Sequence, residues 1–210
     1  MAKAPIEGQV KTRLCPPYRP ADAAILASAF LLDTWSIANA AFERPAVLAF
    51  AGPLAGFPME LAKVDKFEQR GLDLGERIGA AINTVLSQRT DNNRVSAALV
   101  IGSDLPGLPV KHLHTARELL VDSDICIGPS ADGGYYLIGA KRWHATALSE
   151  IAWSTNRTRE QTIDDLRKRG FTVCLAPSYD DIDHAHDLDA LMRTDRPAPF
   201  TRNAYHRLLR

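Results

Sequence analysis

The most constraining feature of this sequence is an alternation of apolar, strand-like runs with segments of helical periodicity. The clearest strand is residues 95–102, VSAALVIG, which is almost entirely apolar. A strand of that composition is usually covered on both faces, as in a parallel sheet. Apolar residues recur at helical spacing before it, over 74–88, and a helix is predicted after it, over 109–121. The alternation predicts an α/β fold with a mostly parallel, doubly wound sheet.

The same patterns divide the rest of the chain into predicted elements. Strands are predicted at 46–50, 64–68, 124–128, 135–140 and 171–176, and helices at 21–41, 155–169 and 184–193. No repeat, low-complexity segment or linker interrupts them. We therefore predict a single domain over residues 1–193 and a C-terminal appendage over 194–210, with a short helix at 203–209.

Charge and composition exclude several classes of protein. The chain of 210 residues has 25 basic and 25 acidic side chains, which argues against a nucleic-acid binder because such proteins usually carry a basic excess. No apolar run approaches the roughly 20 residues that cross a bilayer, and the N-terminus lacks a signal-peptide core. We expect a cytoplasmic protein without a membrane span. The three scattered cysteines suggest no disulfide framework, and the two H-x-H pairs fit solvated helix ends better than zinc.

A basic loop opens the chain. Residues 3–17, KAPIEGQVKTRLCPP, place Lys3, Lys11 and Arg13 around Gly8, directly before the first predicted helix. Polyphosphate groups are bound by fixed cations and free backbone amides, and an arginine can meet two phosphate oxygens at once. A solvated basic loop would have the same composition, and spacing alone does not decide between the two.

Asp104 directly follows the most apolar strand. Ligands of open α/β sheets bind beyond the carboxyl ends of the strands, and a carboxylate there can hold Mg²⁺ or Mn²⁺ together with substrate phosphates. The alternative is a turn aspartate that caps Leu105 or Gly107. The position after a core strand favours the metal ligand.

A second acidic group lies in residues 179–188, YDDIDHAHDL. Four carboxylates within ten residues repel one another, and a shared cation would relieve that repulsion. Asp183, or Asp181 beside it, is therefore a candidate second metal ligand. Asp183 is also a good N-cap for the helix predicted at 184–193.

The segment SADGGYYLIGA, residues 130–140, breaks a strand at its entrance with Asp132, Gly133 and Gly134. Either a tight Asp-Gly turn feeds the strand, or the glycines let the backbone approach a ligand. Tyr135 and Tyr136 point to opposite faces of a strand, so at most one of them can line a pocket.

Six segments, taken together and in this order, resemble a known family. It is the bacterial group of small GT-A-type glycosyltransferases associated with arsenosugar biosynthesis or with radical-SAM enzymes, within the nucleotide-diphospho-sugar transferase superfamily. The chain is also similar to nucleotidyltransferases of that superfamily, such as phospholactate guanylyltransferase and the molybdenum-cofactor cytidylyl- and guanylyltransferases. The matching segments are Lys3–Leu14, Asp73–Arg77, Gly102–Pro106, Gly128–Gly139, Trp153–Thr155 and Asp181–Leu188.

The resemblance implies a GT-A-like fold and a role for each segment. It implies that Asp104 holds the Mg²⁺ or Mn²⁺ ion, that the DGG stretch borders the acceptor, and that Asp132 is placed to act as a general base. A contact of Trp153 and Ser154 with the acceptor is a weaker inference. The nucleotide-binding residues would be Lys3, Gly8, Lys11, Arg13, Asp73, Gly75 and Arg77, and the acceptor-binding residues Gly133, Gly134, Tyr135, Trp153 and Ser154.

The chain also departs from the family pattern. An apolar strand normally precedes the K-A-P segment, whereas this sequence begins two residues before Lys3, so either the start lies upstream or the sheet lacks its usual first strand. Leu72 stands where a small or polar residue is common, and His184 replaces the usual threonine after D-I-D.

Three functions follow from the sequence. The first is transfer of a sugar from a nucleotide diphosphate to a small-molecule acceptor. The second is nucleotidyl transfer from an NTP with release of pyrophosphate, which we rank lower because those enzymes tend to have a more glycine-rich first loop. The third is a degenerate nucleotide-binding protein without turnover.

Overall fold

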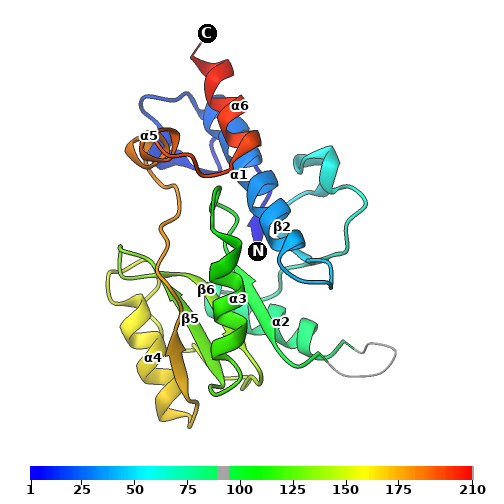
Figure 1. Ribbon diagram of the computed structural model, residues 1–210, viewed down its shortest axis with the longest axis vertical. Coiled ribbons are helices and arrows are strands. Elements are labelled where there is room, and N and C mark those ends of the chain that lie inside the picture. The colour runs from blue at the N-terminus through cyan, green and yellow to red at the C-terminus, as the bar shows by residue number, and fades with distance from the viewer. Residues whose placement is uncertain (89–94, 210) are drawn as a thin grey trace. The chain divides into compact units, whose positions relative to one another are not determined.

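The computed structural model describes residues 1–88 and 95–209 and has a mixed α/β fold (Figure 1). Arg210, the last residue of the predicted appendage, lies outside the described residues. The chain forms two compact units, which are described in turn. Unit 1 contains residues 1–68, 102–110 and 181–210, and unit 2 contains residues 69–101 and 111–180.

Unit 1 contains a parallel sheet of three short strands. They are β1 (Ala2–Lys3), β2 (Leu48–Ala51) and β3 (Lys66–Glu68), in the order β1-β2-β3. Both pairs are parallel, with Ala2 beside Phe50 and Leu48 beside Lys66. The strands predicted at 46–50 and 64–68 are confirmed. The sequence left open whether the sheet lacks its usual first strand, and the structure has Ala2 and Lys3 in a short strand beside β2.

The helices of unit 1 bring both ends of the chain into one core. They are α1 (Pro20–Ala40), α5 (Ala185–Met192) and α6 (Pro199–Leu208), with short 3₁₀ helices at Thr12–Leu14, Leu54–Gly56 and Met59–Leu61. Figure 1 shows α6 lying beside α1. Asp33 of α1 accepts hydrogen bonds from the backbone amides of Phe200 (3.1 Å) and Thr201 (2.8 Å), at the start of α6. Residues of the predicted appendage thus pack into the core of unit 1.

Helix α1 lies within one residue of its predicted bounds, but it is apolar over a length that the sequence analysis did not expect. It has 21 residues and a mean hydropathy of 1.3, so by length and composition alone it could cross a membrane. Half of its most apolar window is buried inside the protein, and Leu26 and Phe30 are fully buried in the core of unit 1. Buried core helices of ordinary domains can be equally long and apolar, so these properties are weak evidence for a membrane span.

Unit 2 contains a mixed sheet. Its strands are β4 (Ala98–Ile101), β5 (Ile125–Pro129), β6 (Tyr135–Ala140) and β7 (Val173–Leu175), in the order β4-β6-β5-β7. Strand β6 runs antiparallel to β4 and β5, and only β5 and β7 are parallel. The prediction of a mostly parallel sheet is wrong here. Residues 130–134 alone connect β5 to β6, which is far shorter than the crossover of a dozen or more residues that parallel strands need.

The helices of unit 2 match their predicted positions. They are α2 (Leu74–Leu86), α3 (Val110–Leu119) and α4 (Thr158–Lys168). Helix α2 buries Ile78 and Ile82 on one face, and the sheet contributes Ile125 and Ile127, which are fully buried. The helical and strand periodicities therefore identified these elements correctly, even where strand direction was wrong.

Asp124, at the start of β5, ties three strand ends together. Its carboxylate accepts hydrogen bonds from Arg142 Nε (2.8 Å), Arg142 Nη2 (3.0 Å) and the Thr172 backbone amide (2.9 Å). The bonds from Arg142 and then from Thr172 lower the pKa of Asp124 below its ordinary value. The carboxylate therefore stabilises the folded protein in its ionised form.

We predict a pH-dependent loss of stability for Asp124→Asn. A lowered pKa gives stability that is present above the ordinary value of about 3.9 and is lost as pH falls through the lower folded value. At pH 7 the variant should lose about 1–3 kcal/mol in urea unfolding, because asparagine cannot replace the charged hydrogen bonds. The difference should shrink below pH 4, and a difference independent of pH would contradict this account.

Candidate functional site

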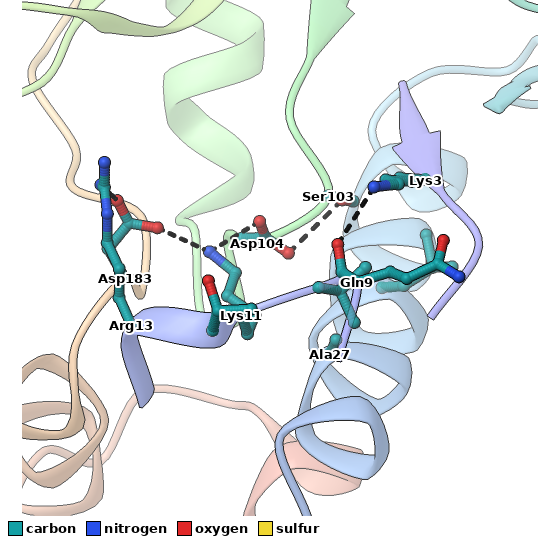
Figure 2. Close-up of a pocket in the computed structure, with 11 residues that line it drawn as sticks. Lys3, Gln9, Lys11, Arg13, Ala27, Ser103, Asp104 and Asp183 are labelled. Atoms are coloured by element: carbon teal, nitrogen blue, oxygen red, sulfur yellow. Dashed lines mark hydrogen bonds and ion pairs between the residues drawn. The ribbon is translucent and has the colours of Figure 1, made fainter. Parts of the chain in front are cut away.

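The basic loop of unit 1 lines a polar cleft of about 260 Å³. Figure 2 shows the side chains that converge there from the loop, from α1, from the segment after β4 and from the segment before α5. Lys3 donates a hydrogen bond to the Gln9 carbonyl (3.1 Å), which holds one end of the loop. The lining residues are Lys3, Gln9, Val10, Lys11, Thr12, Arg13, Ala27, Leu31, Ser103, Asp104 and Asp183.

Lys11 lies at the centre of the cleft between two carboxylates. Its Nζ is 2.7 Å from Asp104 Oδ2 and 2.9 Å from Asp183 Oδ1, and its side chain is only 7% exposed. Burial alone would lower the pKa of Lys11, but the charges of Asp104 and Asp183 outweigh it and raise the pKa above its ordinary value. The lysine is therefore a buried, charged ammonium held by two carboxylates that come from distant segments.

The loop backbone turns sharply to place this ammonium. Lys11 has φ 47° and ψ 38°, in the left-handed region that non-glycine residues rarely occupy. Gly8, earlier in the loop, has φ +72°. Arg13 follows on the short helix Thr12–Leu14 and donates to Asp183 Oδ2 at 2.7 Å, with its side chain 62% exposed. The candidate cations Lys11 and Arg13 thus meet the candidate metal ligand Asp183.

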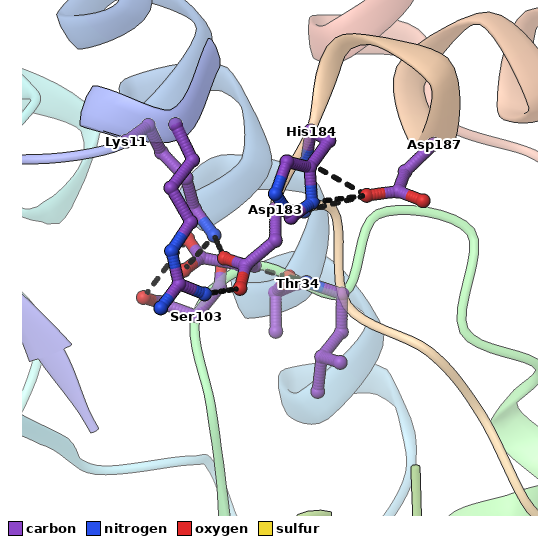
Figure 3. Close-up of polar contacts among 9 residues, drawn as sticks. Lys11, Thr34, Ser103, Asp183, His184 and Asp187 are labelled. Carbon is purple, nitrogen blue, oxygen red and sulfur yellow. Dashed lines mark hydrogen bonds and ion pairs between the residues drawn. The ribbon is translucent and has the colours of Figure 1, made fainter. Parts of the chain in front are cut away.

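Thr34 of α1 fixes the position of the Asp104 segment (Figure 3). Its buried hydroxyl donates to the Ser103 carbonyl (3.1 Å) and accepts from the Leu105 amide (3.0 Å). On the other side, the Ile182 amide donates to the Asp104 carbonyl (3.0 Å). Sequence reasoning missed Thr34, because a threonine within an apolar helix gives no sign of a partner 70 residues away. It also missed Ser103, whose signal was its position beside Asp104.

We predict that Thr34→Val destabilises the protein by about 1–3 kcal/mol. Valine keeps the shape of the side chain but leaves the buried Leu105 amide and the partly buried Ser103 carbonyl without their partner. Thr34→Ser keeps the hydroxyl and is the matched control. Urea unfolding of the two variants measures the difference, and equal stability would show that the hydroxyl does not hold this segment.

The acidic segment contributes two carboxylates to the neighbourhood of Lys11. Burial, and then the charge of Asp183, raises the pKa of Asp181 to about 6, and Asp104 adds to the effect. Asp183 behaves oppositely: burial would raise its pKa, but Lys11 and Arg13 lower it below the ordinary value. The alternative that Asp183 caps the helix predicted at 184–193 is wrong, because the N-cap of α5 is His184 and the Asp183 carboxylate is turned to Lys11.

Asp104 and Asp183 have the chemistry of a divalent-cation site. Two carboxylate oxygens converge on one positive nitrogen, and Mg²⁺ and Mn²⁺ prefer oxygen ligands of this kind. The alternative was that Asp104 only caps a turn. Its side chain instead forms an ion pair with Lys11, which is 93 residues away in the sequence. The two carboxylates have the chemistry to hold such an ion, and that role stays a prediction.

A group of imidazole and carboxylate side chains lies at the start of α5. His184, His186 and Asp187 offer ligand atoms within 4.8 Å of one another, and both histidines are exposed. The rings stack at 5.3 Å between centroids, while Asp187 Oδ2 accepts from the amides of Asp183 (3.1 Å) and His184 (2.7 Å). The sequence favoured solvated helix ends here, and the exposure agrees with that interpretation.

In unit 2, the DGG segment forms a tight turn. Asp132 Oδ1 accepts from Ser130 Oγ (2.6 Å) and from the Gly134 amide (2.9 Å). Gly133 has φ +86°, and a Cβ there would lie 2.0 Å from the Asn156 carbonyl oxygen. The glycine is therefore required by the turn and by the close approach of segment 154–156. The structure accounts for these residues locally, and their role toward an acceptor stays a prediction.

Trp153, Tyr135 and Gly75 pack together in unit 2. The rings of Tyr135 and Trp153 meet edge to face at 6.4 Å, and a Cβ on Gly75 would lie 2.9 Å from Trp153. Burial raises the pKa of Tyr135. Ser154 has φ 61° and does not cap α4, whose N-cap is Arg157.

The D-L-G-E-R segment forms the first turn of α2. Asp73 is its N-cap and accepts from the Glu76 amide (2.8 Å). Arg77 Nε donates to the Gly71 carbonyl (3.1 Å), and Glu76 accepts from the Leu72 amide (2.7 Å). Capping explains Asp73 and close packing explains Gly75. A contact of Asp73, Gly75 or Arg77 with a nucleotide remains a prediction from the resemblance.

Comparison with known families gives a match over residues 37–155, to a family described as "Uncharacterized protein conserved in bacteria (DUF2064)". The chain belongs to this family. The matched range contains Asp73, Asp104 and Asp132, whereas the basic loop and Asp183 lie outside it. No curated protein matches the chain.

Among solved structures, a protein from Desulfovibrio desulfuricans G20, described as a candidate nucleotide-diphospho-sugar transferase, is similar over nearly the whole chain. The TM-score is 0.82 at 29% identity, covering 99% of this chain and 90% of that one. Rv0371c from Mycobacterium tuberculosis H37Rv matches with a TM-score of 0.47 and 18% identity over 91% and 95% of the two chains. A homolog of Rv0371c from Mycobacterium sp. strain JC1 scores 0.44 at 15% identity over 84% and 83%. The two mycobacterial likenesses are too distant to inform function.

Proposed function

We propose that this protein is a metal-assisted transferase that moves a sugar from a nucleotide diphosphate to a small-molecule acceptor. The observation that carries the proposal is the convergence of Lys11, Asp104 and Asp183 in one polar cleft of unit 1. The similarity to the Desulfovibrio protein supports the same class of reaction. The arsenosugar or radical-SAM-associated subtype rests on the sequence resemblance and is the finer part of the proposal.

Each group in the cleft has a role that its chemistry allows. Breaking the bond between sugar and diphosphate leaves negative charge on the diphosphate, and a divalent cation held by Asp104 and Asp183 would stabilise that charge. Lys11 and Arg13 would bind the phosphate oxygens, and Lys3 would extend the same positive rim. By the sequence resemblance, Asp132 of unit 2 would orient an acceptor hydroxyl or take its proton.

Nucleotidyl transfer is the second candidate, because it needs the same cations and carboxylates. The description of the Desulfovibrio protein favours sugar transfer over it. The two reactions differ in their products: nucleotidyl transfer releases pyrophosphate from an NTP, whereas sugar transfer releases a nucleoside diphosphate. A degenerate binding protein would release neither.

A thermal-shift screen of nucleotides and nucleotide sugars with Mg²⁺ or Mn²⁺ tests the proposal. We expect a metal-dependent rise in melting temperature with at least one nucleotide diphosphate or its sugar, since a ligand that binds the folded state raises its apparent stability. Ligands that shift the melting temperature are then assayed for both products. A folded sample that responds to none of them would argue against an enzyme of this superfamily.

A further inference from the structure

Lys11 occupies the position that the proposed divalent cation needs. The two carboxylate oxygens that would coordinate the ion, on Asp104 and Asp183, lie 2.7 Å and 2.9 Å from the same ammonium nitrogen. Figure 2 shows this nitrogen directed at both carboxylates rather than along the open cleft. An ammonium and a divalent ion cannot share these oxygens at such distances without strong repulsion.

The ammonium can leave only if another anion receives it. Its side chain is 7% exposed, so withdrawal without a new partner would leave a poorly solvated charge. Apart from Lys11 and its two carboxylate partners, the charged side chains that line the cleft are the cations Lys3 and Arg13, and the nearby Asp181 is not part of the lining. The phosphate oxygens of an incoming nucleotide are the partner that the cleft itself does not offer.

A nucleotide without a metal ion meets a related difficulty. The charge of Lys11 is already neutralised by Asp104 and Asp183, and Asp183 also engages Arg13 at 2.7 Å. A diphosphate that enters without a metal ion would bring negative charge close to Asp104 and Asp183. The cations that could attract it, Lys11 and Arg13, are already paired with these carboxylates. Each ligand therefore removes the obstacle to the other.

We propose that Lys11 is a built-in occupant of the cation position, so that the cleft accepts a divalent cation and a nucleoside diphosphate together and disfavours either one alone. The substrate of the site is then the metal–nucleotide complex, and Lys11 changes from a carboxylate partner to a phosphate partner when the complex binds. The expectation that a nucleotide binds rests on the proposed function. The expectation that Lys11 competes with a divalent cation depends only on Lys11, Asp104 and Asp183.

Binding of Mn²⁺ alone tests the cation part. The free Mn²⁺ signal in electron paramagnetic resonance is titrated with the wild type, Lys11→Met, Lys11→Gln and the control Lys63→Met, which removes an exposed lysine of the same unit outside the lining of the cleft. We expect both Lys11 variants to bind Mn²⁺ at least about tenfold more tightly than the wild type, within the usual range of coupling between sites. Lys63→Met should match the wild type. Equal Mn²⁺ affinity in the wild type and both Lys11 variants would overturn the proposal.

Two double variants show which residues bind the additional Mn²⁺. Adding Asp104→Asn to Lys11→Met should abolish the increase in Mn²⁺ affinity, whereas adding His186→Ala to Lys11→Met should leave that increase unchanged. The second result separates the carboxylate pair from the imidazole group at the start of α5. A gain that disappears with His186→Ala would place the ion elsewhere and overturn the proposal. Circular dichroism confirms that each variant is folded before titration.

The nucleotide part is tested by repeating the Mn²⁺ titration with ADP, CDP, GDP and UDP. In the wild type, a diphosphate that binds should raise Mn²⁺ affinity at least about tenfold, and the rise should be smaller in Lys11→Met. If the Lys11 variants gain Mn²⁺ affinity but no diphosphate binds, the cation part stands and the proposed function fails. If a diphosphate binds with Mn²⁺ while Lys11→Met behaves as the wild type, the proposed function stands and this inference fails.

Discussion

Replacing Asp104 with asparagine is expected to abolish the metal-dependent stabilisation of the protein by nucleotide diphosphates. Asparagine keeps the size of the side chain but loses the charge that would hold a divalent cation beside the phosphates. A ligand at roughly 100 times its Kd stabilises a protein by about 2.7 kcal/mol, which corresponds to a rise in melting temperature of roughly 5–10 °C for a chain of this size. Most of that rise should vanish in Asp104→Asn.

The matched control is Asp195→Asn, which removes an exposed carboxylate from the same unit. It should keep the full metal-dependent shift in the same thermal denaturation series. Asp104→Asn must also be compared with the wild type without ligands, because it removes a partner of Lys11. A wild-type response retained in Asp104→Asn would mean that the cation, if one binds, is held by other residues.

Gly133→Ala is expected to be among the most destabilising single substitutions in unit 2. The new methyl carbon would lie 2.0 Å from the Asn156 carbonyl oxygen and 2.5 Å from its carbon, so the backbone of one segment must move. It would also force alanine to φ +86°, which costs about 1–2 kcal/mol on its own. We expect a total loss of more than about 3 kcal/mol in urea unfolding.

Gly170→Ala measures the backbone strain without the collision, so the difference between the two variants gives the part of the loss that comes from the collision. Gly170 has a similar backbone angle, φ +78°, but a Cβ there meets no heavy atom within 4 Å. Gly170→Ala should therefore lower the free energy of unfolding only by the cost of backbone strain, about 1–2 kcal/mol. If the two variants lose the same free energy, then the contact with Asn156 is not what requires the glycine.

The turn that contains Gly133 also bears on the role of Asp132. The sequence left open whether the DGG segment serves a turn or a ligand, and the hydrogen bonds of Asp132 to Ser130 and Gly134 show that the turn is real. A structural turn does not exclude a contact with the acceptor, because only one carboxylate oxygen is used in it. A test of Asp132 as a base therefore needs a variant that keeps the turn, and Asp132→Asn is the best available.

The sequence by itself determined where most of the helices and strands lie, because hydrophobic periodicity is a local property of the chain, but it missed the short strand β1 and placed the start of α6 four residues too late. It also identified Lys11, Arg13, Asp104 and Asp183 as chemically matched groups, although they are up to 172 residues apart. It could have indicated the direction of β6, since the five residues between Pro129 and Tyr135 are too few for a parallel crossover.

Only the tertiary structure decided how those charges are paired. Whether a lysine faces phosphate, solvent or two carboxylates depends on side chains brought together by folding, and no spacing in the sequence encodes that choice. The same holds for Thr34, whose hydroxyl supports the Asp104 segment from a helix 69 residues away, and for Asp33, which caps a helix at the other end of the chain. Long-range pairing of buried polar groups follows from packing, and packing follows from the whole fold.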